Sequence, residues 1–229
     1  MRQRLQLRQY RQLLIAAFAS CVVLMACTPD ESTPLKNVSG LLPDLKFALT
    51  DDTGHAVTAH DYRGDIVLVF FGFTSCEDVC PLTMARLAEA LSETDGHGQG
   101  MRVLFVTVDP ARDTIDRLHD YVRSFGPEFV GLRGSAEELR GLAKRYRVVY
   151  SQGNPDANGE YEVMHSGGVF VFDQSGRARY LVMPDDPASA ITKGLDRLAA
   201  RAGERASLLS ISDLRSFDPG LNPKICFAG

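Results

Sequence analysis

The sequence has no excess of positive charge. Its 229 residues carry 25 Lys and Arg against 29 Asp and Glu, a formal net charge of −4. Removal of residues 1–26, which contain four arginines and no acid, leaves 21 basic against 29 acidic side chains, a balance of −8. Because an acidic protein is repelled by phosphate backbones, this balance argues against a nucleic-acid-binding protein.

A long apolar run is also lacking. The most apolar segment, Leu13 to Ala26, is shorter than the roughly 20 residues that a membrane-spanning helix needs, and it follows a basic stretch. This pattern is typical of a signal peptide. The segment ends in Leu24-Met25-Ala26-Cys27, which resembles the cleavage motif of a bacterial lipoprotein. We expect cleavage after residue 26 and a lipid on Cys27. An uncleaved anchor or an ordinary cleavage site are the alternatives, and each of them exports the domain.

Internal repeats and low-complexity tracts are absent from the sequence as well. Residues 27–40 are polar and contain proline, which is typical of a flexible tether. The remaining length, with 45% apolar residues in the whole chain, suffices for one good core. We therefore expect one domain over residues 41–203 and a C-terminal extension over residues 204–229 to which no role is assigned.

Cysteine is scarce, and its five positions have different fates. Cys21 lies inside the signal segment, Cys27 is the lipid candidate, and Cys226 is left over near the C-terminus. Cys76 and Cys80 form the one closely spaced pair. A disulfide between them would close a very small loop and would constrain the unfolded chain little, so the pair indicates a functional role.

The paired cysteines follow an apolar run, Ile66 to Phe73, which predicts a buried strand. Apolar residues recur at helical spacing after them, which predicts a helix from Pro81 to about Ser92. The thiols then lie where a strand meets a helix start, and the backbone N–H groups there favour the thiolate form. Two thiolates at such a place can exchange disulfides or bind a soft metal.

The rest of the chain alternates strands and helices. The order predicts an α/β protein with a thioredoxin-like sandwich and an added N-terminal β-hairpin. The hairpin is expected from Leu45–Leu49 and Ala56–Thr58, the further strands at Val103–Val108, Val169–Phe172 and Ala178–Val182, and the further helices at Thr114–Phe125, Ser135–Tyr146 and Pro187–Ala200.

His165 is the third candidate ligand. It lies just before the strand expected at Val169–Phe172, in a loop that faces the cysteine loop of a thioredoxin-like fold. The other four histidines have no such context. Two thiolates and one imidazole form a soft ligand set that suits Cu(I), and the imidazole also allows Cu(II). The ligand types alone leave zinc open.

Three motifs in this order resemble the Sco/SenC family, exported copper-binding proteins with a thioredoxin-like fold that help to assemble cytochrome c oxidase. They are residues 71–81 with the cysteine pair, residues 106–114 with the sequence VTVDPARDT, and His165-Ser166 ahead of the strand from Val169. The resemblance extends over roughly residues 42–200. It implies that Cys76, Cys80 and His165 bind copper, and that Asp109 lies near them.

Four neighbouring positions deserve separate expectations. Glu77 stands where family members often have proline, and its charge is expected to raise the thiol pKa and shift the redox balance without removing a ligand. Asp109 either turns the chain or orients a ligand through a hydrogen bond. Arg112 and Asp113 are expected to serve the turn and the following helix start.

The resemblance implies a metallochaperone, tethered to the membrane and facing the periplasm. It would deliver copper to the dinuclear copper site of cytochrome c oxidase subunit II or to another copper-receiving protein. A membrane-tethered thiol–disulfide reductase and a copper or redox sensor would use the same pair. The CxxxC spacing, and His-Ser-Gly-Gly in place of a cis-proline before Val169, argue against the reductase.

Overall fold

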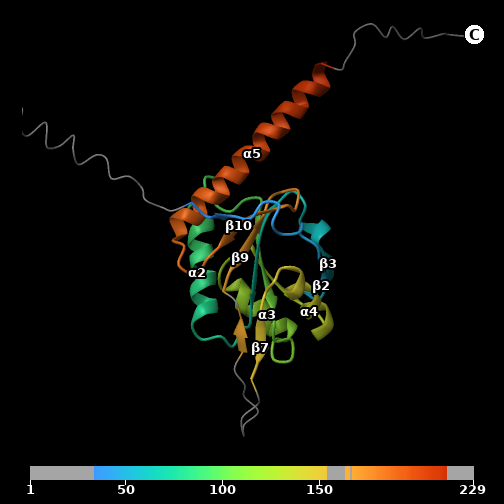
Figure 1. Ribbon diagram of the computed structural model, residues 1–229, viewed down its shortest axis with the longest axis vertical. Coiled ribbons are helices and arrows are strands. Elements are labelled where there is room, and N and C mark those ends of the chain that lie inside the picture. The colour runs from blue at the N-terminus through green and yellow to red at the C-terminus, as the bar shows by residue number, and fades with distance from the viewer. Residues whose placement is uncertain (1–33, 154–162, 166, 216–229) are drawn as a thin grey trace, which may run out of the picture. The chain divides into compact units, whose positions relative to one another are not determined.

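The computed structural model describes residues 34–153, 163–165 and 167–215. The predicted signal segment, Cys27 and Cys226 lie outside these residues. The fold is a mixed α/β thioredoxin-like sandwich built on a twisted sheet (Figure 1). The helices are η1 (Ala59–Tyr62), α2 (Val79–Ser92), α3 (Ile115–Arg123), α4 (Ala136–Arg145) and α5 (Ala188–Arg215). The strands are β1 (Lys36–Asn37), β2 (Ala48–Asp51), β3 (Ala56–Thr58), β4 (Ile66–Gly72), β5 (Met101–Thr107), β6 (Phe129–Arg133), β7 (Tyr150–Gln152), β8 (Val163–His165), β9 (Val169–Phe172) and β10 (Ala178–Val182).

The main sheet has the strand order β1-β10-β9-β4-β5-β6-β2-β3. Strands β4, β5 and β6 run parallel, whereas β9 pairs antiparallel with β4. The register places Gly72, the last residue of β4, opposite Thr107, the last residue of β5. The loops that follow these two strands therefore leave the sheet at the same edge, and the antiparallel β9 begins at that edge too.

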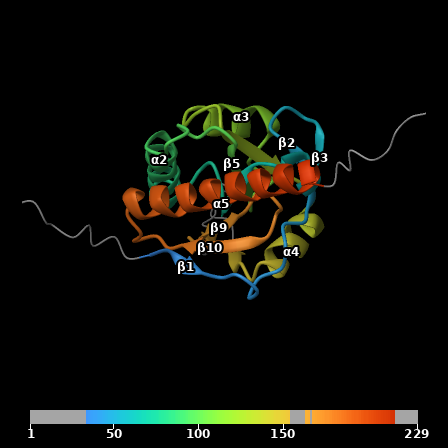
Figure 2. The same cartoon turned by 90° about the horizontal axis from the view of Figure 1, so that it is seen from above.

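Strand β4 forms the centre of the core because all seven of its residues are buried. Its alternate side chains face opposite sides of the sheet, as the two-residue period of a strand requires. Ile66, Leu68 and Phe70 join a cluster with α2, α3 and α5. Val67, Val69 and Phe71 join a second cluster with α4. Figure 2 shows α2 and α3 on one side of the sheet and α4 on the other.

The ends of several elements differ from the sequence expectation. Helix α2 begins at Val79, two residues before Pro81, and α5 continues to Arg215 instead of ending near residue 200. Residues 36–37, expected in the tether, form β1 and pair with β10, and the neighbouring Leu35 and Val38 are buried. The packed part of the chain thus begins before residue 41.

The N-terminal hairpin lies at one edge of the sheet. Strands β2 and β3 pair antiparallel, and β2 also pairs with β6. The first strand is shifted along the chain from the expected 45–49 to Ala48–Asp51. Strand β6 was not predicted, although it joins the hairpin to the parallel core.

Candidate functional site

The two cysteines occupy unequal positions between β4 and α2. Cys76 lies in the loop and is half-buried, and its backbone N–H donates to the carbonyl of Phe73 over 3.2 Å. Cys80 is the second residue of α2 and has no exposed surface. Both cysteines are in the reduced state. Pro81 is tolerated in this first helical turn because its missing N–H would have no partner within the helix.

A glycine at the end of β4 makes room for the buried sulfur. A Cβ atom at Gly72 would lie 2.8 Å from Sγ of Cys80 and 2.6 Å from the Phe105 ring. Both distances are far below van der Waals contact, so any side chain here would displace the thiol or the ring. The absence of a side chain at Gly72 therefore lets α2 approach the sheet closely enough to bury Cys80.

The surroundings of Cys80 favour the neutral thiol. Burial is the main cause of its raised pKa, and the side chain of Cys76 and the charge of Asp113 raise it further. A hydrogen bond from the backbone N–H of Phe73 acts in the opposite direction but is outweighed. The expectation that the helix start makes this sulfur a thiolate is thus wrong for copper-free Cys80, because desolvation outweighs the helix dipole.

Asp113 connects the cysteine loop to the neighbouring strand. Its buried carboxylate accepts hydrogen bonds from the Thr74 hydroxyl over 2.6 Å, from the Thr74 backbone N–H over 3.2 Å, and from the Thr107 hydroxyl over 2.5 Å. The expectation of a simple turn or cap residue missed this role. One available signal was the position of an acid shortly after a buried strand whose end lies beside the cysteine loop.

Asp109 and Arg112 form a second connection. The Asp109 carboxylate is fully buried and accepts a charged hydrogen bond from Nε of Arg112. The Arg112 guanidinium lies over the Phe73 ring, 5.9 Å from its centroid. Asp109 is therefore linked to the cysteine loop indirectly, through Arg112 and Phe73. Arg112 makes this link in addition to its place in the turn.

Glu77 has an exposed side chain. The carboxylate among the causes of the raised Cys80 pKa is that of Asp113. Besides the charge of the nearby Cys76, the charge that raises the pKa of the buried thiol is thus that of Asp113, a residue distant in sequence.

His165 lies at the end of a short strand ahead of β9. It is the last residue of β8 and pairs with Tyr150 of β7. Two residues later, a Cβ at Gly167 would lie 3.6 Å from the side chain of Val79, the neighbour of Cys80. The chain after His165 therefore touches the start of α2. Among the described residues, no cluster of three His, Cys, Asp or Glu side chains forms, and the imidazole of His165 lies outside what the structure describes.

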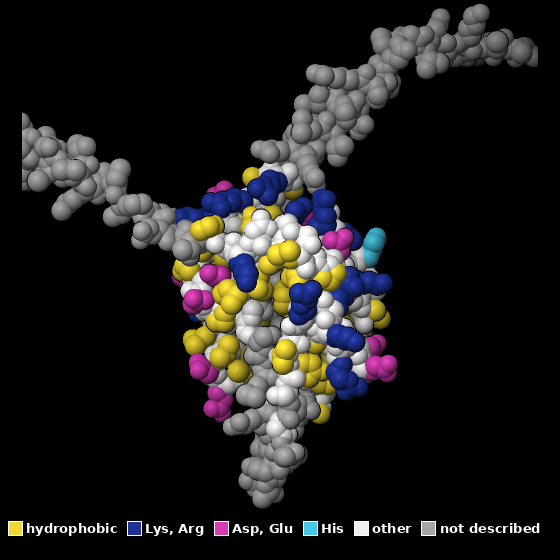
Figure 3. Space-filling model, viewed as in Figure 1, with side chains coloured by type: hydrophobic (Ala, Val, Ile, Leu, Met, Phe, Trp, Pro, Cys, Tyr) yellow, Lys and Arg dark blue, Asp and Glu magenta, His cyan; other side chains and the backbone are white. Residues whose placement is uncertain are grey.

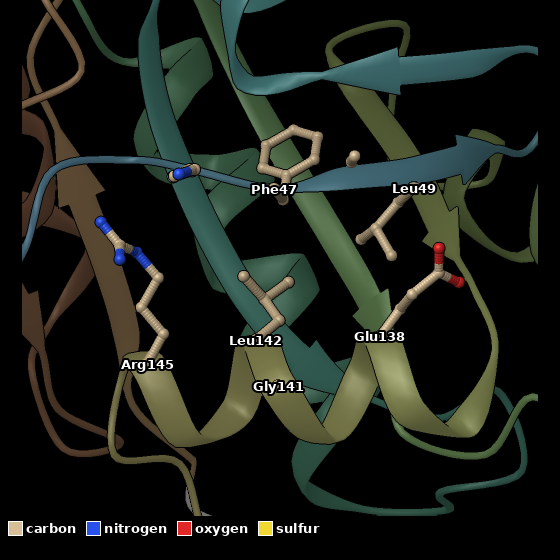
Figure 4. Close-up of a pocket in the computed structure, with 8 residues that line it drawn as sticks. Phe47, Leu49, Glu138, Gly141, Leu142 and Arg145 are labelled. Carbon is tan, nitrogen blue, oxygen red and sulfur yellow. The ribbon is translucent and has the colours of Figure 1, made fainter.

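Two hollows lie away from the cysteines. A 430 Å³ hollow between β2 and α4 is lined by Phe47, Leu49 and Leu142 (Figure 4). Two of the charged groups that line it have partners, since Arg145 donates to the Asp44 carbonyl and Glu138 accepts from Ser135. A shallow 810 Å³ hollow lies between α4 and the start of β7. On the face of the molecule shown in Figure 3, charged side chains are intermixed with apolar ones. Neither cysteine lines either hollow.

Comparison with known proteins identifies the family. The model of the SCO1/SenC family matches residues 42–200, more than half of the chain. The chain belongs to the SCO1/SenC family. This confirms the resemblance derived from the three motifs.

No helix among the described residues is long and apolar enough to span a bilayer.

Relatives in this family come from bacteria and mitochondria. The SCO2-like protein of Rickettsia felis is 30% identical over 72% of this chain and 82% of its own length. The human mitochondrial SCO1 homologue is 38% identical over 57% of this chain and 44% of its own length. The chain thus matches about half of the length of the mitochondrial relatives.

The solved structures of the family share the fold. The crystal structure of Arabidopsis thaliana ScoI, described with copper bound, is 30% identical and has a TM-score of 0.63 over 69% of this chain and 98% of its own. The ScoI protein of Bradyrhizobium japonicum, also described with copper bound, is 31% identical and has a TM-score of 0.62 over 68% of this chain and 98% of its own.

Proposed function

We propose that this Sco/SenC protein is an exported copper metallochaperone in which Cys76, Cys80 and His165 hold the metal. The observation that carries the proposal is the pair of reduced cysteines at one strand–helix junction, with Gly167, two residues after His165, close to the same helix start. Family membership and the copper-bound relatives support copper as the cargo.

The donor set explains the choice of metal. Thiolates are soft ligands that favour Cu(I), and an imidazole adds a nitrogen donor that Cu(II) prefers. The buried Cys80 has to lose its proton when copper binds, because the thiolate is the ligand. The positive charge of the metal then replaces the proton in a site where an unpaired thiolate would be costly.

The unequal exposure of the two sulfurs suits transfer. Cys76 is half-buried and accessible to a partner, whereas Cys80 is enclosed in the core. An incoming thiol or imidazole can bind the metal on the Cys76 side first and displace the chain's own ligands one at a time. Such ligand exchange moves copper without a change in its oxidation state.

The recipient we propose is the dinuclear copper site of cytochrome c oxidase subunit II, which the family resemblance implies. Attachment through a lipid on Cys27 would keep the protein at the periplasmic membrane surface near such a recipient. The lipid anchor stays a prediction from the sequence, since Cys27 lies outside the described residues.

Copper loading of the reduced protein tests this function. The parent should retain one copper ion per chain after anaerobic loading and desalting, and a Cys76→Ser/Cys80→Ser variant should retain none at this site. Cys226→Ser is the control, because it makes the same Cys-to-Ser change outside the proposed site, and it should bind copper as the parent does. Unchanged copper in the double variant, or a preference for zinc over Cu(I) in competition, would refute the proposal.

The same preparations separate the chaperone from a thiol–disulfide reductase. A reductase uses the cysteine pair to turn over a disulfide substrate with excess reductant, and its activity has no need of copper. A chaperone should pass its copper to a copper-free acceptor and show negligible turnover of a disulfide substrate. Rapid turnover without metal would favour the reductase.

A further inference from the structure

Tyr121 has a buried hydroxyl group that lacks a hydrogen-bond partner in the part of the chain that the structure describes. Its ring on α3 packs between Phe105 and Phe125, with centroid distances of 5.2 and 5.3 Å. The hydroxyl oxygen is enclosed, and among the described residues it has no hydrogen-bond partner. A buried polar group left unpaired costs about 1–3 kcal/mol. The folded copper-free protein therefore keeps an unfavourable group at this position.

The hydroxyl lies in the neighbourhood of the cysteines. Phe105 packs against Tyr121. The Phe105 ring and the Cys80 sulfur both lie where a side chain at Gly72 would be. Tyr121 and Cys76 both pack against the apolar cluster that contains Cys80. The groups whose charges raise the Tyr121 pKa, after burial itself, are Cys80, Cys76 and Asp113. The two cysteine sulfurs therefore lie near enough for their charge to act on the hydroxyl, and a sulfur accepts hydrogen bonds more strongly as a thiolate.

We propose that Tyr121 is a positioning residue of the copper-loaded site and that its hydroxyl donates a hydrogen bond to a cysteine sulfur once that sulfur is a copper-bound thiolate. A neutral thiol is a weak acceptor, whereas hydrogen bonds to a charged acceptor are about twice as strong. In the structure as described no sulfur accepts from this hydroxyl, so copper loading has to bring a thiolate within hydrogen-bond distance of it. This inference rests on the proposed copper site and adds a residue that the three ligands do not include.

Because the proposed hydrogen bond forms only when copper is bound, removal of the Tyr121 hydroxyl should affect the copper-free and the copper-loaded protein in opposite ways. In Tyr121→Phe the copper-free protein loses an unpaired polar atom and keeps the ring, so its stability should stay equal or increase. The copper-loaded protein loses a donor to sulfur, so copper should bind more weakly. A purely structural tyrosine would instead lower the stability of the copper-free protein when its hydroxyl is removed.

The experiment compares the full chain with Tyr121→Phe, in both copper-free and loaded forms. We expect the same stoichiometry, an equal or higher unfolding temperature without copper, and Cu(I) affinity reduced about tenfold or more in chelator competition. We also expect the thiolate-to-Cu(II) absorption band to move to longer wavelength, because an unbonded thiolate donates electrons more easily. Parent-like affinity and band position, or a lower unfolding temperature without copper, would overturn the inference.

Tyr146→Phe is the matched control. The Tyr146 hydroxyl accepts from the backbone N–H of Lys46 over 2.9 Å and donates to the Asp44 carbonyl over 3.0 Å, on the opposite face of the sheet. Its removal should lower the unfolding temperature and leave copper affinity and the absorption band unchanged. A parent protein that binds no copper would overturn both the proposed function and this inference, whereas a loaded parent with an unaffected Tyr121→Phe variant would overturn the inference alone.

Discussion

At the scale of single residues, burial makes Cys80 costly to ionise. Cys80 is enclosed by the core, and burial raises the pKa of its thiol above the ordinary value. In the folded copper-free protein this sulfur therefore keeps its proton over a pH range in which an unfolded chain would lose it. Bound copper lowers the cost of ionising Cys80, because the positive metal compensates the thiolate charge.

The raised pKa of Cys80 predicts how stability changes with pH. The contribution of the protonated Cys80 thiol to the free energy of unfolding is fully present below the unfolded thiol pKa of about 8.5. Above it the unfolded chain releases the Cys80 proton while the folded protein retains it, so the free energy of unfolding falls as pH rises towards the folded-state pKa. Denaturant unfolding of the reduced, copper-free protein between about pH 8 and 9.5 should show a decline of up to about 1.4 kcal/mol per pH unit.

Two alanine variants serve as controls for this pH dependence. Cys80→Ala removes the titrating group, so the decline should become shallower than in the parent. Cys76→Ala should retain most of it, because burial, the largest cause of the Cys80 shift, stays in place. An equally steep decline in Cys80→Ala and the parent would contradict the account.

At the scale of elements, local pattern predicted the strand and helix that carry the cysteines but not every neighbour. Strand β4 is a continuous apolar run, and α2 repeats apolar residues at helical spacing, so both are readable from sequence. Strand β6 is a short FVGLR segment whose extended form depends on pairing with β5 and β2. At Gly131 within it, a Cβ would lie 2.4 Å from the Leu118 side chain, a packing requirement that local pattern does not reveal.

The hydrogen bonds of Asp113 hold the cysteine loop against β5. In Asp113→Asn an amide NH₂ group replaces one carboxylate oxygen. This group then faces groups that donate to the carboxylate in the parent, namely the Thr74 N–H, the Thr74 hydroxyl and the Thr107 hydroxyl. The variant should lose about 1–3 kcal/mol of unfolding free energy, because buried hydrogen bonds to a charged acceptor are lost. Alkylation of Cys76 should become faster as the loop loosens. Denaturant unfolding and thiol-labelling kinetics measure the two effects.

Asp120→Asn is the control for Asp113→Asn. It makes the same chemical change at an exposed position on α3, so both stability and labelling should stay close to the parent values. If Asp113→Asn behaves like Asp120→Asn, then the carboxylate does not fix the loop.

At the scale of the whole molecule, the sequence revealed the ligands better than their support. Cys76 and Cys80 are close in the chain, and their spacing alone marks them as a functional pair. Asp113 and Tyr121 come into the neighbourhood of the pair only because β5 ends beside β4 and because α3 packs on the same face. This arrangement depends on strand order and register, which local sequence pattern does not specify.

The surface around the site also depends on tertiary structure. The half-buried Cys76 sits where the β4–α2 loop leaves the sheet, and the chain before β9 meets the start of α2 there. The chain that follows His165, the candidate ligand most distant in sequence, leads into β9, which pairs antiparallel with β4. The proposed copper site is thus assembled by the fold from two segments separated by more than 80 residues.

X-ray absorption at the copper edge tests this central claim most directly, because it reports the atoms bound to the metal. The copper-loaded parent should show sulfur scatterers from the cysteine pair together with a histidine nitrogen. His165→Ala should lose the imidazole signal and keep the sulfur signal. His60→Ala, which changes an exposed histidine on η1, should match the parent. A spectrum without sulfur, or an imidazole signal that persists unchanged in His165→Ala, would contradict the account.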